Sequence, residues 1–293
     1  MIAGPTAVGK TDVAIQVAQH FDAEILSADS RQCYREMTIG TAKPSFEELS
    51  QVKHHFINSH SITEDLNAAD YEQLALQYCS EIFKDKNLAV VCGGTGLYIK
   101  ALCEGIDDMP KTDKAIEKQL QQGFEENGIM WLQEKVAKED PDFFETAEQQ
   151  NPSRLIRGLA FKMTTGQSIN NFRSGKKKQR PFQIIKIALE LPRAELYERI
   201  NYRVDKMMEA GLLEEATALY PQRQLKNLQT VGYTEIFDFL GGNTDLKLGI
   251  ELIKQHSRNY AKRQLTWFKK DKEFEWFPPI DAPNILQYIN SLR

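Results

Sequence analysis

The chain has 293 residues, of which 41% are hydrophobic and 27% are charged, and a formal net charge of -4, an ordinary balance for a globular protein of one elaborated domain or two. No apolar run approaches the ~20 residues that span a bilayer, and no signal-peptide pattern opens the chain, so we expect a cytoplasmic protein without membrane association. The four cysteines include no C-x-x-C pair, which favours reduced thiols over a disulfide framework or a zinc site.

The first pattern along the chain is a phosphate loop. Its residues fit G-x-x-x-x-G-K-[ST] at every specified position: Gly4, Pro5, Thr6, Ala7, Val8, Gly9, Lys10 and Thr11. Between the glycines the backbone N–H groups must point inward at an anion, Lys10 adds a positive charge, and the Thr11 hydroxyl can hold Mg²⁺. A glycine turn that fits by chance is the alternative, and the order of strand, loop and helix favours the phosphate site.

The segments on both sides of the loop supply that strand and helix. Apolar side chains within residues 13–18 have helical spacing, so a helix begins at the loop and adds its N-terminal dipole to the anion site. Only residues 1–3 precede the loop, a short stub for the strand that feeds it. We therefore expect further residues upstream.

A carboxylate follows the next predicted strand. Residues 23–28 are typical of a short buried strand, and Asp29 comes directly after it. In open α/β sheets ligands bind at the carboxyl ends of the strands, so Asp29 should face the phosphate site. There it can bind Mg²⁺, accept a proton from a nucleophile or cap a turn, and the residue type leaves all three roles open.

A further strand, a helix and another strand are expected at residues 54–57, 68–83 and 87–92. His54 and His55 are adjacent, so on a strand they point to opposite faces and cannot share one metal ion. We favour a structural role for both histidines.

The strand at 87–92 ends in Gly93 and Gly94. Many phosphate-loop nucleotidases place there an Asp that holds Mg²⁺. Its absence favours a transferase over a hydrolytic motor or switch. Thr95 and the glycines would let a bulky substrate approach the backbone closely.

From residue 107 onward the pattern changes to polar helices, at 115–124, 128–137 and 152–165. We therefore predict a helical insertion domain at 107–181, within a core formed by 1–106 and 182–293.

Two kinds of basic residue occur in the insertion. Arg154 and Arg157 lie three apart and so share a helix face, which makes them a candidate anion-binding pair. The lysine run at 176–178 is more typical of a solvated loop than of a binding site.

A strand is predicted at 182–191, followed by helices, an edge strand at 274–277 and a closing helix at 285–292. Charge is divided unevenly along the chain. Residues 1–150 carry 13 Lys and Arg against 26 Asp and Glu, whereas residues 151–272 carry 23 against 12. The later half could meet a polyanion, and a solvated basic surface without a partner is an equal alternative on charge alone.

One long helix in this half has basic residues at every fourth position and aromatic residues between them: Lys254, Arg258, Lys262, Arg263, Tyr260, Trp267 and Phe268. Basic stripes with aromatic side chains can bind phosphates and stack unpaired bases. The alternative, which is better supported by this helix alone, is that Trp267 and Phe268 are core residues and the lysines are solvated.

Taken together, these motifs resemble those of the tRNA dimethylallyltransferase family, also called tRNA isopentenyltransferases. The matching segments run in family order: residues 4–11, 29–34, 37–44, 93–98, 151–157, 203–205, 211–212, 231–233 and 260–268. The sequence departs from the family pattern at Val8, Cys33, Gly158 and Thr234, and in the clipped first strand. Thr234 replaces a basic residue, which weakens one phosphate contact.

The fold expected from this resemblance is α/β, with a phosphate-loop NTPase-like parallel sheet flanked by helices and a helical insertion domain. The implied activity is transfer of a dimethylallyl group from dimethylallyl diphosphate to the exocyclic amine (N6) of the adenosine 3′-adjacent to the anticodon in tRNA. We expect a monomer that uses Mg²⁺.

The roles implied for single residues fall into three groups. The phosphate loop, residues 4–11, binds the diphosphate, with Thr11 as the metal ligand. Asp29 is the catalytic base, and by family likeness Thr6 and Arg203 join the catalytic group. The residues expected at tRNA, partly by resemblance and partly from the charge distribution, are Asp29, Ser30, Arg31, Gln32, Thr95, Arg154, Arg157, Gly232, Tyr233, Lys262 and Arg263.

Two other functions share these features. A small-molecule or nucleoside kinase would use the same loop and the same base, with ATP as the phosphoryl donor. A non-catalytic RNA-binding protein would keep the loop only as a remnant.

Overall fold

The computed structural model describes residues 1–293 as two compact units: Met1–Gly105 together with Gln179–Arg293, and Ile106–Lys178. The boundaries expected from the sequence were 1–106 with 182–293, and 107–181. No helix is both long enough and apolar enough to cross a membrane.

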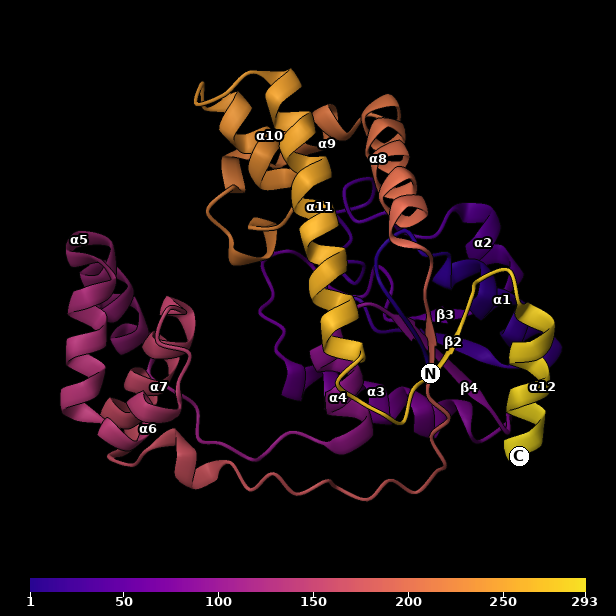
Figure 1. The fold of residues 1–293 in the computed structure, drawn as a ribbon, viewed down its shortest axis with the longest axis horizontal. Coiled ribbons are helices and arrows are strands. Elements are labelled where there is room, and N and C mark those ends of the chain that lie inside the picture. Colours follow the sequence, from indigo (N-terminus) through magenta and orange to yellow (C-terminus); the bar gives the residue numbers. More distant parts are fainter. The chain divides into compact units, whose positions relative to one another are not determined.

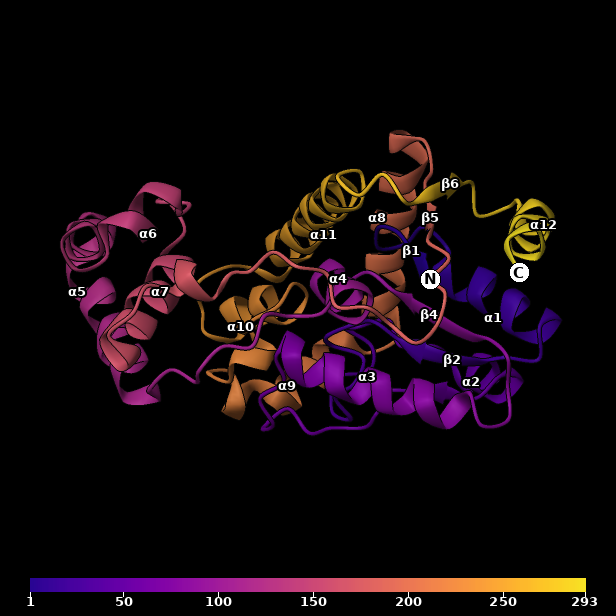
Figure 2. The ribbon, with the colours of Figure 1, turned by 90° about the horizontal axis from the view of Figure 1, so that it is seen from below.

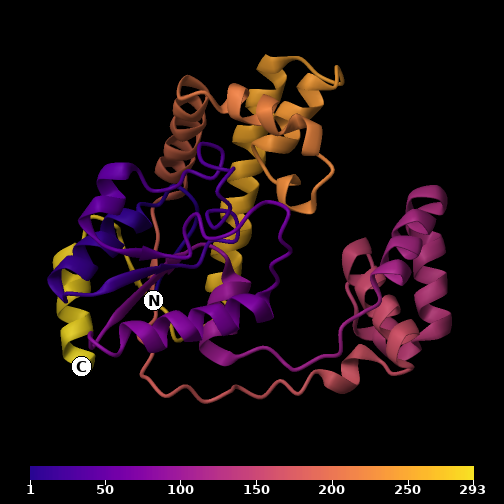
Figure 3. The ribbon, with the colours of Figure 1, turned by 180° about the vertical axis from the view of Figure 1, so that it is seen from behind.

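The first unit is built on a six-stranded parallel sheet, which confirms the predicted fold class. Its strands are β1 (Ile2–Ala3), β2 (Glu24–Ser27), β3 (His54–His55), β4 (Ala89–Gly93), β5 (Ile187–Leu189) and β6 (Glu275–Phe277). They lie in the order β3-β2-β4-β1-β5-β6. The N-terminal strand is therefore inside the sheet, as the position of the N-terminus shows (Figures 1 and 3), and β4 and β5 are its neighbours.

The four inner strands, β2, β4, β1 and β5, are largely buried, and their successive residues point to opposite faces of the sheet. Ile25 and Val90 belong to one apolar core, and the next residues, Leu26 and Val91, belong to the other. The first core is completed by α1 (Lys10–His20) and α12 (Ala282–Leu292), which lie side by side (Figure 2).

The opposite face is covered by α3 (Ala68–Ile82) and α4 (Gly96–Glu104), whose side chains complete the second core. The short α2 (Phe46–Gln51) precedes β3.

The chain between β5 and β6 is almost entirely helical, as predicted. It forms α8 (Arg193–Glu209), α9 (Leu212–Leu219), α10 (Tyr233–Leu240) and α11 (Leu246–Phe268), with 3-10 turns at Tyr220–Gln222 and Lys226–Leu228. The long helix α11 packs against α8 and α10 and, at its other end, against α4 (Figure 1). It thus extends from the helical layer to the carboxyl edge of the sheet.

The second unit is helical and has its own apolar core, which includes Leu120, Leu132 and Leu155. Its helices are α5 (Lys114–Glu139), α6 (Pro141–Thr146) and α7 (Pro152–Thr165), followed by a 3-10 turn at Ile169–Phe172. The two helices predicted at 115–124 and 128–137 are both present within α5, separated at Gly128, whose φ of 78° and ψ of -174° are not helical. Helix α6 has only six residues and was not predicted.

Candidate functional site

The phosphate loop connects β1 to α1 and has the curled backbone that the motif predicts. Gly4 and Gly9 have φ of 148° and 100°, and a Cβ on Gly4 would lie 2.8 Å from the carbonyl oxygen of Leu189. No side chain caps the first turn of α1. Its N–H groups, together with the helix dipole, therefore form an anion site.

Lys10 lies within this site. Its Nζ donates a hydrogen bond to the carbonyl oxygen of Pro5 at 2.7 Å. The pKa of Lys10 is lowered from 10.5 to about 8, mainly by burial and in part by Arg203, while Cys92 and Asp29 oppose the shift. Burial also lowers the pKa of the Arg203 guanidinium, again opposed by Asp29. Two desolvated cations and one carboxylate therefore act on one another beside the loop.

Asp29 comes directly after β2 and caps the turn that follows it. Its Oδ1 accepts hydrogen bonds from the backbone N–H groups of Arg31 at 2.8 Å and Gln32 at 3.3 Å. Capping is thus one role of this carboxylate. Both bonds use Oδ1, so Oδ2 is left to accept a proton or a ligand.

The turn after β4 lies against the end of β2. The N–H of Thr95 donates to the carbonyl oxygen of Ala28 at 3.1 Å, and the N–H of Ser30 donates to Thr95 Oγ1 at 3.0 Å. A Cβ on Gly93 would lie 2.3 Å from the Ala28 oxygen, so this close approach requires glycine. These contacts place Thr95 and Ser30 next to Asp29.

Helix α11 packs against both the phosphate loop and the turn after β4. Gln264, which is buried, accepts a hydrogen bond from the N–H of Thr6 at 2.8 Å and donates one to the carbonyl oxygen of Gly94 at 2.9 Å. One turn earlier, Tyr260 has its pKa raised to about 12, first by burial and then by Asp29. The phenol of Tyr260 is therefore close enough to Asp29 to be affected by its charge.

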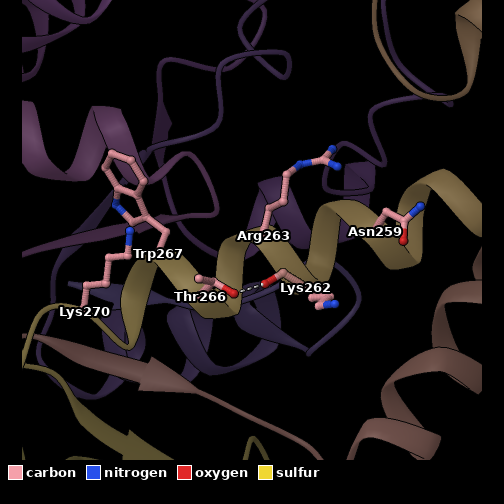
Figure 4. Close-up of a pocket in the computed structure, with 6 residues that line it drawn as sticks. All are labelled: Asn259, Lys262, Arg263, Thr266, Trp267 and Lys270. Carbon is pink, nitrogen blue, oxygen red and sulfur yellow. Dashed lines mark hydrogen bonds between the residues drawn. The ribbon is translucent and has the colours of Figure 1, made fainter. Parts of the chain in front are cut away.

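The exposed side of α11 forms an open pocket of about 370 Å³, lined by Asn259, Lys262, Arg263, Thr266, Trp267 and Lys270 (Figure 4). Figure 4 shows Arg263 and Trp267 pointing to one side of the helix, and Lys262 and Thr266 lying on another. Trp267 is 41% exposed, whereas Phe268 is buried, so the expectation that both are core residues is wrong for Trp267.

Three residues expected at RNA have hydrogen-bond partners within the protein. Gly232 and Tyr233 are buried, and the Tyr233 hydroxyl donates to Glu215 Oε1 at 2.6 Å, so contact of these residues with RNA stays a prediction that their burial does not favour. Gln32 Nε2 donates to the carbonyl oxygens of Thr41 and Ala42, at 3.2 and 3.0 Å. Its side chain therefore connects two parts of the segment between β2 and α2.

The adjacent histidines of β3 have separate partners. His55 Nε2 contacts Glu24 Oε2 at 2.5 Å, and His54 Nδ1 lies 2.7 Å from the carbonyl oxygen of Val52. Both contacts fit the structural role predicted for the pair.

In the second unit, Arg154 and Arg157 are exposed on α7, and Arg154 pairs with Glu148 at 3.1 Å. Sequence reasoning missed Arg173. Its pKa is lowered first by burial and then by Arg157 and Arg154, so three guanidinium groups lie within electrostatic reach of one another. Arg173 follows a 3-10 turn, and no helical spacing links it to the other two.

The protein offers few side-chain ligands for a metal ion near the phosphate loop. Thr11 lies in the first turn of α1, and the structure contains no group of three His, Cys, Asp or Glu side chains that could hold a metal. A hydroxyl oxygen suits Mg²⁺, which commonly takes most of its ligands from water and substrate phosphates. The residues present fit that pattern.

Comparisons with known proteins cover nearly the whole chain. A family model described as IPP transferase matches residues 32–271. A tRNA dimethylallyltransferase of Christiangramia forsetii is 49% identical over 99% of this chain and 96% of its own length.

Two solved structures are also similar. A tRNA isopentenylpyrophosphate transferase from Bacillus halodurans has a TM-score of 0.74 and 36% identity, with 99% of this chain and 94% of that chain covered. A eukaryotic dimethylallyltransferase, described as acting on tRNA, has a TM-score of 0.73 and 27% identity, with 91% and 68% covered. The backbone likeness thus extends beyond the phosphate loop to most of the chain.

Proposed function

The chain belongs to the IPP transferase family, and from this premise we propose that it transfers a dimethylallyl group from dimethylallyl diphosphate to the N6 amine of the adenosine on the 3′ side of the tRNA anticodon. The chain is a prenyltransferase that acts on tRNA. The donor and the position of the adenosine are the finer parts of the proposal.

The observation that carries the mechanism is the position of Asp29 beside two desolvated cations at the phosphate loop. The loop N–H groups, Lys10 and Arg203 neutralise the negative charge that develops on the diphosphate as the C–O bond breaks. Thr6 is on the same loop. Mg²⁺ held at Thr11 would supply further neutralisation of the diphosphate charge.

Asp29 accepts the proton from the attacking amine. The new N–C bond forms as the C–O bond to the diphosphate breaks, and one N6 proton must leave, because an adenine amine is a weak nucleophile and the alkylated nitrogen would otherwise keep a positive charge. The Oδ2 atom is suited to receive it, since Oδ1 holds the turn.

The acceptor base must leave its stack, which costs a few kcal/mol and costs least in a tRNA loop. Thr95, Ser30 and Arg31 adjoin Asp29, and Lys262 and Arg263 are exposed on α11, so these residues support binding of the loop. Arg154 and Arg157 offer a second basic surface in the insertion. We propose that one copy of the chain carries both surfaces and acts as a monomer.

The alternative of a small-molecule kinase is set aside. The relatives are named dimethylallyltransferases, and the buried strand β4 ends in glycine rather than in an Asp.

The test replaces Asp29 with Asn. An Asn side-chain oxygen can still accept the hydrogen bonds from Arg31 and Gln32, so the turn is kept while the base is lost. Transfer of labelled dimethylallyl from its diphosphate into unmodified tRNA should fall by roughly 10²- to 10⁴-fold. Asp12→Asn, which removes an exposed carboxylate from the first turn of α1, is the matched control and should keep full activity.

Activity of Asp29→Asn close to that of the unaltered protein would remove Asp29 as the base. Absence of label in RNA together with phosphate transfer from ATP would overturn the proposed function.

A further inference from the structure

Gln264 joins three segments that are far apart in sequence. From α11 it accepts a hydrogen bond from Thr6 in the phosphate loop and donates one to Gly94 in the turn after β4, at 2.8 and 2.9 Å. It is only 6% exposed, so water does not offer these groups an alternative partner. Its Oε1 accepts one of these bonds and its Nε2 donates the other, and an amide side chain provides both an acceptor and a donor.

The side chain of Gln264 packs directly against the backbone of Gly94. A Cβ on Gly94 would lie 2.3 Å from Gln264 Nε2. Three residues further along α11, Trp267 covers Gly96 in the same way, since a Cβ there would also lie 2.3 Å from the indole ring. One face of α11 is therefore fixed against the turn that adjoins both the phosphate loop and Asp29.

The same helical turn also carries exposed basic side chains. Lys262 and Arg263 directly precede Gln264, and they line the open pocket on α11 (Figure 4). An RNA that binds these side chains contacts the same turn of α11 that holds the N–H of Thr6. Ordering of this turn by either ligand would reduce the entropy that the other must lose on binding.

We propose that Gln264 is a positioning residue that couples binding of RNA on α11 to binding of the diphosphate at the phosphate loop. This inference rests on the proposed function, because it takes the polyanion on α11 to be the acceptor RNA. Coupling of this kind is reciprocal: RNA raises the affinity for the diphosphate by the same factor by which the diphosphate raises the affinity for RNA.

The experiment measures that factor without turnover. The RNA is an anticodon stem-loop with inosine in place of the acceptor adenosine, which removes the exocyclic amine. Binding of dimethylallyl diphosphate is titrated by calorimetry with and without this RNA. In the unaltered protein we expect a change in affinity of about 5- to 150-fold, the usual range for coupled sites.

Two variants test the role of Gln264, one by removing its hydrogen bonds and the other by displacing its amide group. Gln264→Met keeps the length of the side chain and removes both hydrogen bonds, and Gly94→Ala displaces the amide by the close contact at Gly94. In both, the coupling factor should fall toward one while binding of the RNA alone is retained. Gln255→Met, on the exposed part of the same helix, is the control and should keep the coupling of the unaltered protein.

A residue that only stabilises the fold would lower the midpoint of thermal unfolding and leave the coupling factor unchanged in the folded variants. That result, or a coupling factor of one in the unaltered protein, would overturn the inference. The proposed function fails separately, if unmodified tRNA receives no dimethylallyl group.

Discussion

Raising the pH should weaken binding of the diphosphate by removing the charge of Lys10. The lysine is desolvated beside the phosphate loop, where burial lowers its pKa from 10.5 to about 8. It therefore begins to lose its proton just above neutral pH, whereas an ordinary exposed lysine keeps it until about pH 10.

The size of the effect follows from these two values. They differ by 2.5, which corresponds to roughly 3 kcal/mol between the charged and neutral forms. A bound diphosphate offsets this cost and raises the pKa again. Between about pH 8 and the pKa in the complex, binding takes up one proton, so the affinity falls by up to about tenfold for each unit of pH.

The free energy of unfolding without ligand should change in the opposite direction. From about pH 8 to 10.5 the unfolded chain binds more protons at this residue than the folded chain does. The contribution of Lys10 to stability therefore rises with pH across that window.

The assay is calorimetric titration of dimethylallyl diphosphate, without RNA, from about pH 7 to about pH 9.5. Lys10→Arg is the control, because a guanidinium keeps its charge throughout this range. The unaltered protein should lose affinity above about pH 8, and the variant should not. A constant affinity in the unaltered protein, or an equally steep loss in Lys10→Arg, would refute the reasoning.

Two other predictions concern residues away from the loop. Changing both Arg154 and Arg157 to Ala should weaken tRNA binding and reduce the slope of log affinity against log salt by roughly 1.5, with little effect on the diphosphate; an unaltered slope would exclude these contacts. Glu215 accepts from three successive backbone N–H groups at residues 38–40 and from Tyr233, so Glu215→Gln should lower the free energy of unfolding by roughly 1–3 kcal/mol in urea titrations. The exposed neighbour variant Glu214→Gln should change it little, and equal stability of all three proteins would contradict this role for Glu215.

The parts of the site that the sequence predicts are those whose signal is local. The phosphate loop is a contiguous pattern, and its glycines and Lys10 are placed as that pattern implies. Asp29 was located by a rule about strand ends, which needs only the order of strand and loop. The parallel sheet follows in the same way from short apolar runs.

The parts that the sequence does not give depend on contacts between distant segments. Thr6 and Gln264 are 258 positions apart, and nothing near either residue indicates the other. Tyr233 was expected at RNA because it belongs to a family motif, but a motif does not show which way a side chain points, and this one is buried against Glu215. Arg173 was not predicted as a member of this basic group, because it lies outside the helix that carries Arg154 and Arg157.

The separate core of the insertion has a consequence for how such an enzyme can diverge. Leu120, Leu132 and Leu155 pack with residues of the same segment, and the chain leaves the sheet-containing unit at Gly105 and re-enters it at Gln179. Substitutions within 106–178 can therefore be absorbed by local repacking, with the backbone around Asp29 undisturbed. The insertion and the phosphate-loop site are in this way free to change at different rates.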